Sequence, residues 1–161
     1  MTDAQKLDAL RGTKLANELN EAQVRILADL VVPHDLEQGE ILVREGTSDN
    51  HLFVVLKGVI GLVKNAGTPD AVTLNTLSAG DFVSELSFLD GTERYASVVA
   101  LGEVQVLELE REKLESLLDT HPHIVYRVMR AIVRFVHQVQ RRLSMQQVEL
   151  SNYIYKQHGR Y

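Results

Sequence analysis

The chain contains no cysteine, which excludes a disulfide framework, thiolate chemistry and any zinc site built on cysteine. This absence suits a reducing compartment, and we expect the protein to be cytoplasmic. No apolar run approaches the roughly 20 residues of a membrane-spanning helix, and the N-terminus lacks a basic segment followed by an apolar one. A net charge of −5 argues against broad electrostatic attraction to nucleic acid or to anionic membranes.

Catalytic and metal-binding motifs are also missing from the sequence. It has no Gly-rich loop of the Walker type and no pairing of a nucleophile with a base. The closest histidines, His121 and His123, flank a proline at a predicted helix start, and only Asp119 is near them. Three such residues at one helix end are too few for a metal site. We therefore expect neither an enzyme nor a bound metal or cofactor.

Regular short β-rich runs fill the middle of the chain and are separated by glycines. The runs span residues 31–36, 40–43, 51–57, 59–64, 71–77, 81–83, 95–101 and 103–109. This pattern predicts a mainly β protein, an antiparallel β-roll or jelly-roll of about eight strands. Helical patterns flank it at residues 4–10, 20–30 and 112–118. We divide the chain at residue 120, with the helices and the roll in 1–120 and a long C-terminal helix in 121–161.

The C-terminal helix is predicted from Pro122 to about Lys156, where no glycine or proline interrupts the chain. Its apolar seam follows a heptad spacing and predicts a coiled-coil homodimer, because a projecting apolar helix must be buried by a partner. Val128, Val133 and Phe135 widen the apolar face where the helix can cover the roll. The seam residues are Val125, Met129, Ile132, Val136, Val139, Leu143, Gln146, Leu150 and Tyr153.

Residues 80–98 indicate a ligand class. Glu85 opens a short helical turn, and Arg94 follows nine positions later, just before an apolar strand. Backbone N–H groups at a helix start and a guanidinium can hold an anion from two sides, and a glutamate can accept a hydrogen bond from a ribose hydroxyl. The layout therefore predicts a phosphate-bearing sugar as the ligand.

Two sequence blocks resemble the cyclic nucleotide-binding domains of the bacterial catabolite activator protein, of cyclic-nucleotide-dependent protein kinases and of gated channels. Residues 85–98 are similar to the phosphate-binding cassette of that family, and residues 39–59 match a second block in the right order. The resemblance implies cAMP or cGMP as a regulatory ligand. It also implies base contacts from Gln138, Val139 and Gln140. The implied binding residues are Ser84, Glu85, Leu86, Ser87, Arg94, Tyr95 and Ala96.

Two positions depart from the family pattern. Ser84 stands where the family usually has glycine, and its hydroxyl can cap the short helix although its side chain can crowd the ligand. Tyr95 stands where a small residue is usual, and its phenol can either stack on the nucleotide or fill the cavity. These departures leave three hypotheses open: a sensor of cAMP or cGMP, a ligand-independent scaffold, and a sensor of another nucleotide such as a cyclic dinucleotide.

The partners follow from the first hypothesis. We expect a stand-alone homodimeric sensor that signals to a downstream protein, without contact with a membrane. Transcription factors of the family continue into a helix-turn-helix, whereas only the short segment 155–161 follows the long helix here. Direct DNA binding is therefore not expected.

Overall fold

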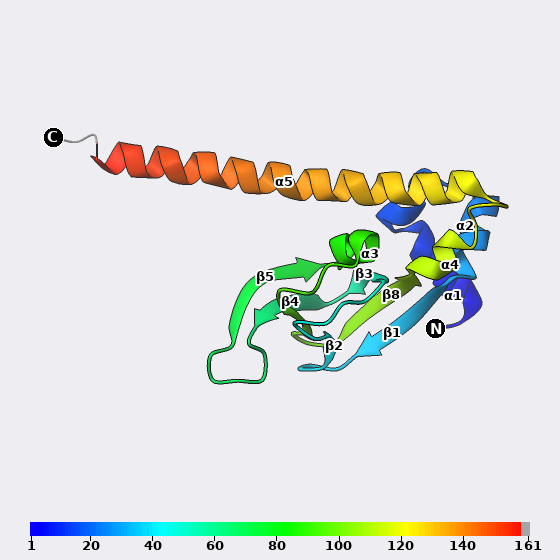
Figure 1. The fold of residues 1–161 in the computed structure, drawn as a ribbon, viewed down its shortest axis with the longest axis horizontal. Helices are drawn as coiled ribbons and strands as arrows, with labels where there is room; N and C mark the ends of the chain where they lie inside the picture. Colours follow the sequence, from blue (N-terminus) through cyan, green and yellow to red (C-terminus); the bar gives the residue numbers. More distant parts are fainter. Residues whose placement is uncertain (159–161) are drawn as a thin grey trace.

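Two four-stranded antiparallel sheets form a β-roll in the computed structural model, which describes residues 1–158 (Figure 1). One sheet has the order β1-β8-β3-β6, and the other has the order β2-β7-β4-β5. The predicted fold class and the eight strands are confirmed. The strands are β1 (Val31–Leu36), β2 (Ile41–Val43), β3 (His51–Lys57), β4 (Val59–Lys64), β5 (Val72–Ser78), β6 (Phe82–Val83), β7 (Ser97–Ala100) and β8 (Val104–Glu110).

Glycine sets the tight turn between β3 and β4. Gly58 has a φ of 85°, in the left-handed region that side chains disfavour. A Cβ atom at this position would lie 2.3 Å from the carbonyl oxygen of Glu103, so the turn also needs the absence of a side chain. Glycine at position 58 is therefore required both by the backbone conformation and by the close packing.

The sheet that contains β3 is covered on both faces, which explains why the middle of β3 is continuously apolar in sequence. Phe53 and Val55 point between the two sheets, and Leu52 and Val54 point toward the helices. All four side chains are at most 4% exposed. An antiparallel strand with one wet face would instead alternate apolar and polar residues.

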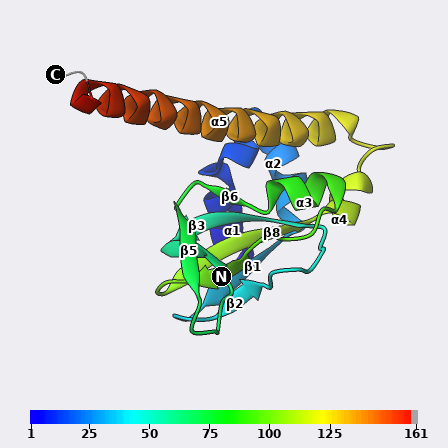
Figure 2. The same ribbon diagram turned by 60° about the vertical axis from the view of Figure 1, so that its left-hand side comes forward.

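The helices at the start of the chain gather on the outer face of this sheet (Figures 1 and 2). Helices α1 (Asp3–Arg11) and α2 (Glu21–Ala28) both begin with a capping box, from Thr2 with Gln5 and from Asn20 with Gln23. A 3₁₀ turn follows α1, and α4 follows β8. These shorter elements span Lys14–Ala16 and Arg111–Glu115.

Helix α5 (Pro122–His158) is a 37-residue helix that extends well past the roll (Figure 1). Its first turns are anchored by Ile124, Val128, Ile132 and Phe135, which are at most 3% exposed. The Phe135 ring contacts that of Phe82, with 4.8 Å between the ring centroids. In residues 1–158 no helix is apolar over a length sufficient to cross a membrane.

The apolar seam predicted on this helix divides between two surfaces. Val125 and Ile132 are buried against the rest of the fold, so they cannot meet another helix. Val133, expected to cover the roll, is 61% exposed and that prediction is wrong, because the anchoring face is centred on Val128 and Phe135. Five of the apolar residues that stay exposed on α5 form a neighbouring stripe, called here the exposed stripe: Tyr126, Met129, Val133, Leu143 and Leu150.

Polar contacts also fix the anchored half of α5 to the N-terminal segment. The Nε atom of Arg130 lies 3.5 Å from a carboxylate oxygen of Glu18, and Arg134 pairs with the same carboxylate. Arg127 donates a hydrogen bond of 2.7 Å to the side-chain oxygen of Gln23. These three arginines therefore pair with polar side chains of the N-terminal segment and hold α5 against it.

Candidate ligand-binding site

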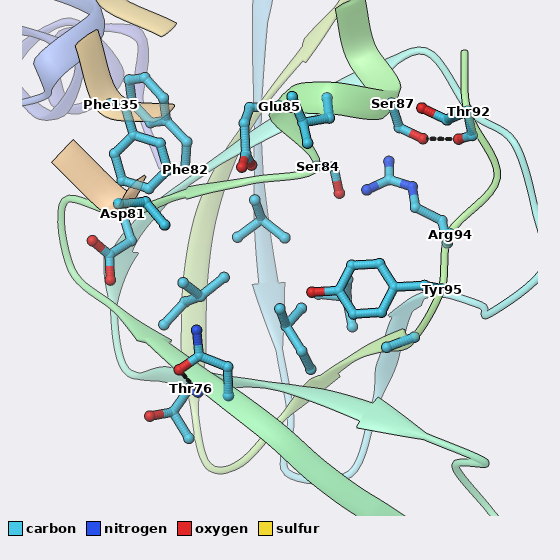
Figure 3. A pocket seen from close by; sticks show the side chains of 18 of the residues that line it. Thr76, Asp81, Phe82, Ser84, Glu85, Ser87, Thr92, Arg94, Tyr95 and Phe135 are labelled. Carbon is cyan, nitrogen blue, oxygen red and sulfur yellow. Dashed lines mark hydrogen bonds between the residues drawn. The ribbon is translucent and has the colours of Figure 1, made fainter. Parts of the chain in front are cut away.

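A cavity of about 480 Å³ lies between the roll, the short helix α3 (Glu85–Asp90) and α5 (Figure 3). Its walls come from β4 and β5, from residues 81–87 and 92–96, and from one face of α5. Pockets that hold small molecules commonly have volumes of about 300–1,000 Å³. All seven cassette residues predicted to bind the ligand line this cavity.

Arg94 is the buried charge of the cavity wall, with only 8% of the residue exposed. Its Nη2 atom donates to a carboxylate oxygen of Asp49 at 2.6 Å and approaches the His51 carbonyl oxygen at 3.5 Å. Its Nε atom is buried and has no partner among the described residues. Asp49 therefore fixes one edge of the guanidinium and leaves donors for another anion.

The backbone around Arg94 is held by the turn that follows β2. The Arg94 amide donates to the Thr47 carbonyl oxygen at 2.9 Å, and the Gly46 amide donates to the Arg94 carbonyl oxygen at 2.8 Å. The glycine-rich block of residues 39–59 thus positions the cassette across the roll. Asp49 comes from this block too, and no local sequence pattern indicates that it pairs with an arginine 45 residues away.

Ser84 precedes α3 in a left-handed conformation, with φ of 75° and ψ of 20°. The expected cap is absent, because the Ser84 side chain makes no hydrogen bond with the helix amides. A capping serine normally has an extended backbone, which aims its oxygen at the second or third helical amide. The prediction of a serine cap is therefore wrong, and the Ser84 hydroxyl is buried without a partner in the described structure.

Glu85 points its carboxylate into the cavity (Figure 3). Burial raises the pKa of this carboxyl, while its own backbone amide and the charge of Arg94 lower it to a smaller extent. Burial of a carboxylate with no ion pair among the described residues disfavours its charged form. The Glu85 carboxylate is well suited to accept a hydrogen bond from a hydroxyl group that enters.

The neighbours of Glu85 contribute differently to the cavity. Leu86 is 55% exposed and offers an apolar surface. Ser87 is buried, and its hydroxyl donates to the Thr92 carbonyl oxygen, which closes the loop after α3. That hydroxyl is therefore already used within the fold. Ala96 is 4% exposed, and its small side chain lets the start of β7 approach the wall closely.

Tyr95 leaves the cavity open. The side chain lines the cavity, yet the residue is 65% exposed (Figure 3). Its carbonyl oxygen accepts a hydrogen bond of 3.1 Å from Lys64, which ties the cassette to the end of β4. The phenol is consequently placed to contact a bound molecule at the mouth of the cavity.

Helix α5 presents a different set of residues to the cavity from the set expected. Val139 lines it as predicted, whereas Gln138 and Gln140 are exposed and do not line it. The phase of α5 is fixed by buried Phe135, and a residue four positions on returns to the same face whereas its immediate neighbours turn away by about 100°. The α5 residues that line the cavity are Phe135, Val139, Arg142, Leu143 and Gln146.

Arg142 and Gln146 were missed, although a signal for them was present. Val139, Leu143 and Gln146 belong to the heptad seam, so one side of that seam faces the cavity. A polar glutamine within an apolar seam marked a place where the helix meets something other than a second apolar helix. Within residues 1–158 no cluster of three or more histidines or carboxylates is placed to hold a metal ion.

Comparison with known proteins identifies this arrangement. The family model of the cyclic nucleotide-binding domain matches residues 33–121, more than half of the chain. The chain therefore belongs to the cyclic nucleotide-binding domain family. Members of this family are ligand-binding regulatory domains, and the matched range includes most of β1, all of β2 to β8 and the whole cassette.

Individual relatives are distant. The chain is 27% identical over 112 residues to isozyme 1 of a cGMP-dependent protein kinase from Drosophila melanogaster, covering 68% of this chain and 15% of the kinase. It is 22% identical to a CRP-like cAMP-activated global transcriptional regulator from Mycobacterium tuberculosis, covering 75% of this chain and 54% of the regulator. The chain thus spans about half or less of these curated relatives.

A solved structure shares the fold over nearly the whole chain. A cyclic nucleotide-binding domain from Methylobacillus flagellatus KT superposes with a TM-score of 0.75 at 23% identity. The match covers 92% of this chain and 83% of the other. At this level of identity the similarity establishes the fold.

Proposed function

We propose that the chain is a regulatory sensor domain that binds a cyclic mononucleotide, cAMP or cGMP, in the cavity beside α3. The observation that carries the proposal is buried Arg94, which Asp49 holds at 2.6 Å in the wall of that cavity. The N–H donors of a buried guanidinium need hydrogen-bond acceptors on each edge. One carboxylate satisfies a single edge of the guanidinium, and a ligand phosphate supplies the second anion.

The ligand follows the cavity from α3 to α5. Its cyclic phosphate lies against Arg94 and the first-turn amides of α3, which have no partner within the helix. Its ribose 2′-hydroxyl donates to Glu85, whose carboxylate points into the cavity. The base reaches toward Val139, Arg142 and Gln146 of α5, while Tyr95 covers the mouth.

Signalling uses α5, because this helix contributes to the cavity wall and also leaves the body of the domain. A ligand that contacts α5 in one arrangement and not in another shifts the population between them. A downstream protein reads that shift. The similarity to a protein kinase and to a transcriptional regulator supports such a regulatory role. The existence of a downstream protein that binds this chain is part of the same proposal.

Homodimerisation through α5 belongs to the same proposal. Five apolar residues of the exposed stripe, between 37% and 62% exposed, follow a spacing that pairs helices in coiled coils. A second copy that covers this stripe would remove it from water. The stripe shares Met129, Leu143 and Leu150 with the seam expected from sequence, whereas Val125 and Ile132 of that seam are already buried by the fold.

Calorimetry with cAMP and with cGMP tests the ligand directly. We expect heat of binding for the natural chain and none for Arg94→Ala, because loss of the guanidinium removes at least two charge-assisted hydrogen bonds. Arg44→Ala is the matched control, since Arg44 is exposed and lies outside the cavity. No detectable binding of either nucleotide at millimolar concentration refutes the proposal.

Two other functions are favoured by the departures at Ser84 and Tyr95. One is a ligand-independent scaffold of the same fold, and the other is a sensor of a larger nucleotide such as a cyclic dinucleotide. A thermal melt that no cyclic nucleotide shifts, in a chain that stays dimeric, supports the scaffold. Native mass spectrometry of freshly purified protein detects a different retained nucleotide by its mass.

A further inference from the structure

We propose that the hydroxyl of Ser84 is an additional ligand contact that donates a hydrogen bond to an exocyclic oxygen of the bound phosphodiester. This inference rests on the proposed function, since it concerns the phosphate end of the same cavity. It gives a positive role to a residue that stands where the family usually has glycine.

The backbone at Ser84 makes the choice of serine costly. Its φ of 75° lies in the left-handed region, where a Cβ atom crowds the following carbonyl oxygen. In the described part of the chain, the other non-glycine residue with positive φ is Asn65, of a type that tolerates this region. Serine gains no such tolerance here, because its side chain makes no hydrogen bond with the start of α3.

The Ser84 hydroxyl also lacks a hydrogen-bond partner within the described chain. Its oxygen is shielded from water and has no partner in the structure described here. An unsatisfied buried hydroxyl destabilises a folded protein, and glycine at this position would remove both the hydroxyl and the backbone strain. Serine at this position therefore needs a compensating interaction that the described residues of the chain do not provide.

A second unsatisfied donor lies at the same end of the cavity. Within residues 1–158, the Ser84 hydroxyl oxygen and the Arg94 Nε atom are both buried and have no hydrogen-bond partner. Figure 3 shows both side chains at the α3 end of the cavity, and both residues line it. The Arg94 atom is Nε, which can only donate, so the two groups are satisfied together by an acceptor placed between them.

A phosphodiester supplies that acceptor. Its monoanion carries two exocyclic oxygens that accept hydrogen bonds and no proton to donate. The Ser84 side chain already points toward the cavity in Figure 3, on the side where Arg94 lies. The contact selects for the phosphate and contributes nothing to the binding of an uncharged nucleoside.

Two substitutions test the contact. Ser84→Ala removes the hydroxyl and keeps the strained backbone, and Ser84→Gly removes both. We expect each variant to bind cAMP or cGMP roughly 10- to 100-fold more weakly by calorimetry, the usual effect of one hydrogen bond to a charged group. We expect the ligand-free Ser84→Gly variant to melt at a higher temperature than the natural chain.

The possible outcomes distinguish failure of the Ser84 contact from failure of cyclic nucleotide binding as a whole. Unchanged affinity in both variants, with normal binding by the natural chain, overturns the hydroxyl contact alone. Tighter binding by Ser84→Gly also overturns it and shows that the side chain crowds the ligand. Failure of the natural chain to bind either nucleotide overturns the proposed function and this contact together.

A second measurement does not depend on the stability of the variants. Cyclic phosphorothioates replace one exocyclic oxygen by sulfur, which is a weaker acceptor, and the two diastereomers place the sulfur at different positions. We expect the natural chain to discriminate between the diastereomers more strongly than Ser84→Ala does. An equal ratio of affinities in both proteins contradicts the contact.

Discussion

Substitution of Phe135 by alanine should detach α5 from the roll. Phe135 is 3% exposed, and its ring contacts Phe82 with 4.8 Å between centroids. The Lys14 ammonium lies 5.2 Å from the centre of the same ring. Removing a fully buried phenylalanine costs about 3–5 kcal/mol, which includes the lost burial and the remaining cavity.

The assay is thermal and urea unfolding of the ligand-free protein. For a chain of 161 residues, each kcal/mol lowers Tm by about 2–4 °C, so Phe135→Ala should lower Tm by roughly 6–20 °C. Because Phe135 also lines the cavity, the same substitution should weaken binding of cyclic nucleotide. His137→Ala, at an exposed position on the same helix, should change stability by less than about 0.5 kcal/mol.

Equal melting temperatures for Phe135→Ala and His137→Ala would refute the reasoning. Such a result means that the first half of α5 is not held by its buried face. A large loss of stability without any change in nucleotide affinity would refute only the prediction that Phe135 contributes to nucleotide binding. Its role in anchoring α5 would still stand.

Three further predictions concern the carboxylate, a turn and the dimer. Glu85→Gln should weaken binding about 10- to 100-fold through loss of a charged acceptor. Since the folded-state pKa of Glu85 is raised by burial, the stability associated with this carboxyl is greatest below its ordinary pKa and is lost as pH rises through the folded-state pKa. Glu85→Gln should therefore flatten that pH dependence in ligand-free melts, and an unchanged profile contradicts the assignment. Gly58→Ala should lower the free energy of unfolding by about 2–4 kcal/mol, because the added methyl group combines a positive φ with a contact of 2.3 Å to the Glu103 carbonyl oxygen. Urea unfolding measures this loss. Gly39→Ala is the control, because nothing lies within 4 Å of the added methyl group there. Combined Leu143→Glu and Leu150→Glu should convert a dimer to a monomer in sedimentation velocity, and a natural chain that is already monomeric at micromolar concentration contradicts the dimer.

The fold could be predicted from sequence because its signals are local. Glycines at the turns and short apolar runs mark the strands, and the uninterrupted segment from Pro122 marks α5. The cassette residues Glu85 and Arg94 were also predicted, since nine positions separate them and a short helix brings them to one cavity. These features depend on backbone geometry over a few residues.

The remaining features of the site depend on contacts between distant segments. Asp49 meets Arg94 only after β2, β3 and the cassette have folded together, so its role has no local signature. The choice of Val139 over Gln138 depends on the rotational phase of α5, which Phe135 fixes by packing on Phe82. Ser84 was misread because a serine before a helix usually has an extended backbone, whereas here the chain reverses through positive φ.

The part of α5 that extends past the roll converts a small change in helix tilt into a large displacement of its end. The segment from residue 140 to residue 158 is exposed where its side chains are described, and at 1.5 Å per residue it is about 28 Å long. A tilt of about 10° at residue 140 therefore displaces the far tip by about 5 Å, a distance close to one helical turn. The cavity residues Arg142 and Gln146 lie close to residue 140, so a small displacement of the helix at the cavity produces a larger displacement at its far end.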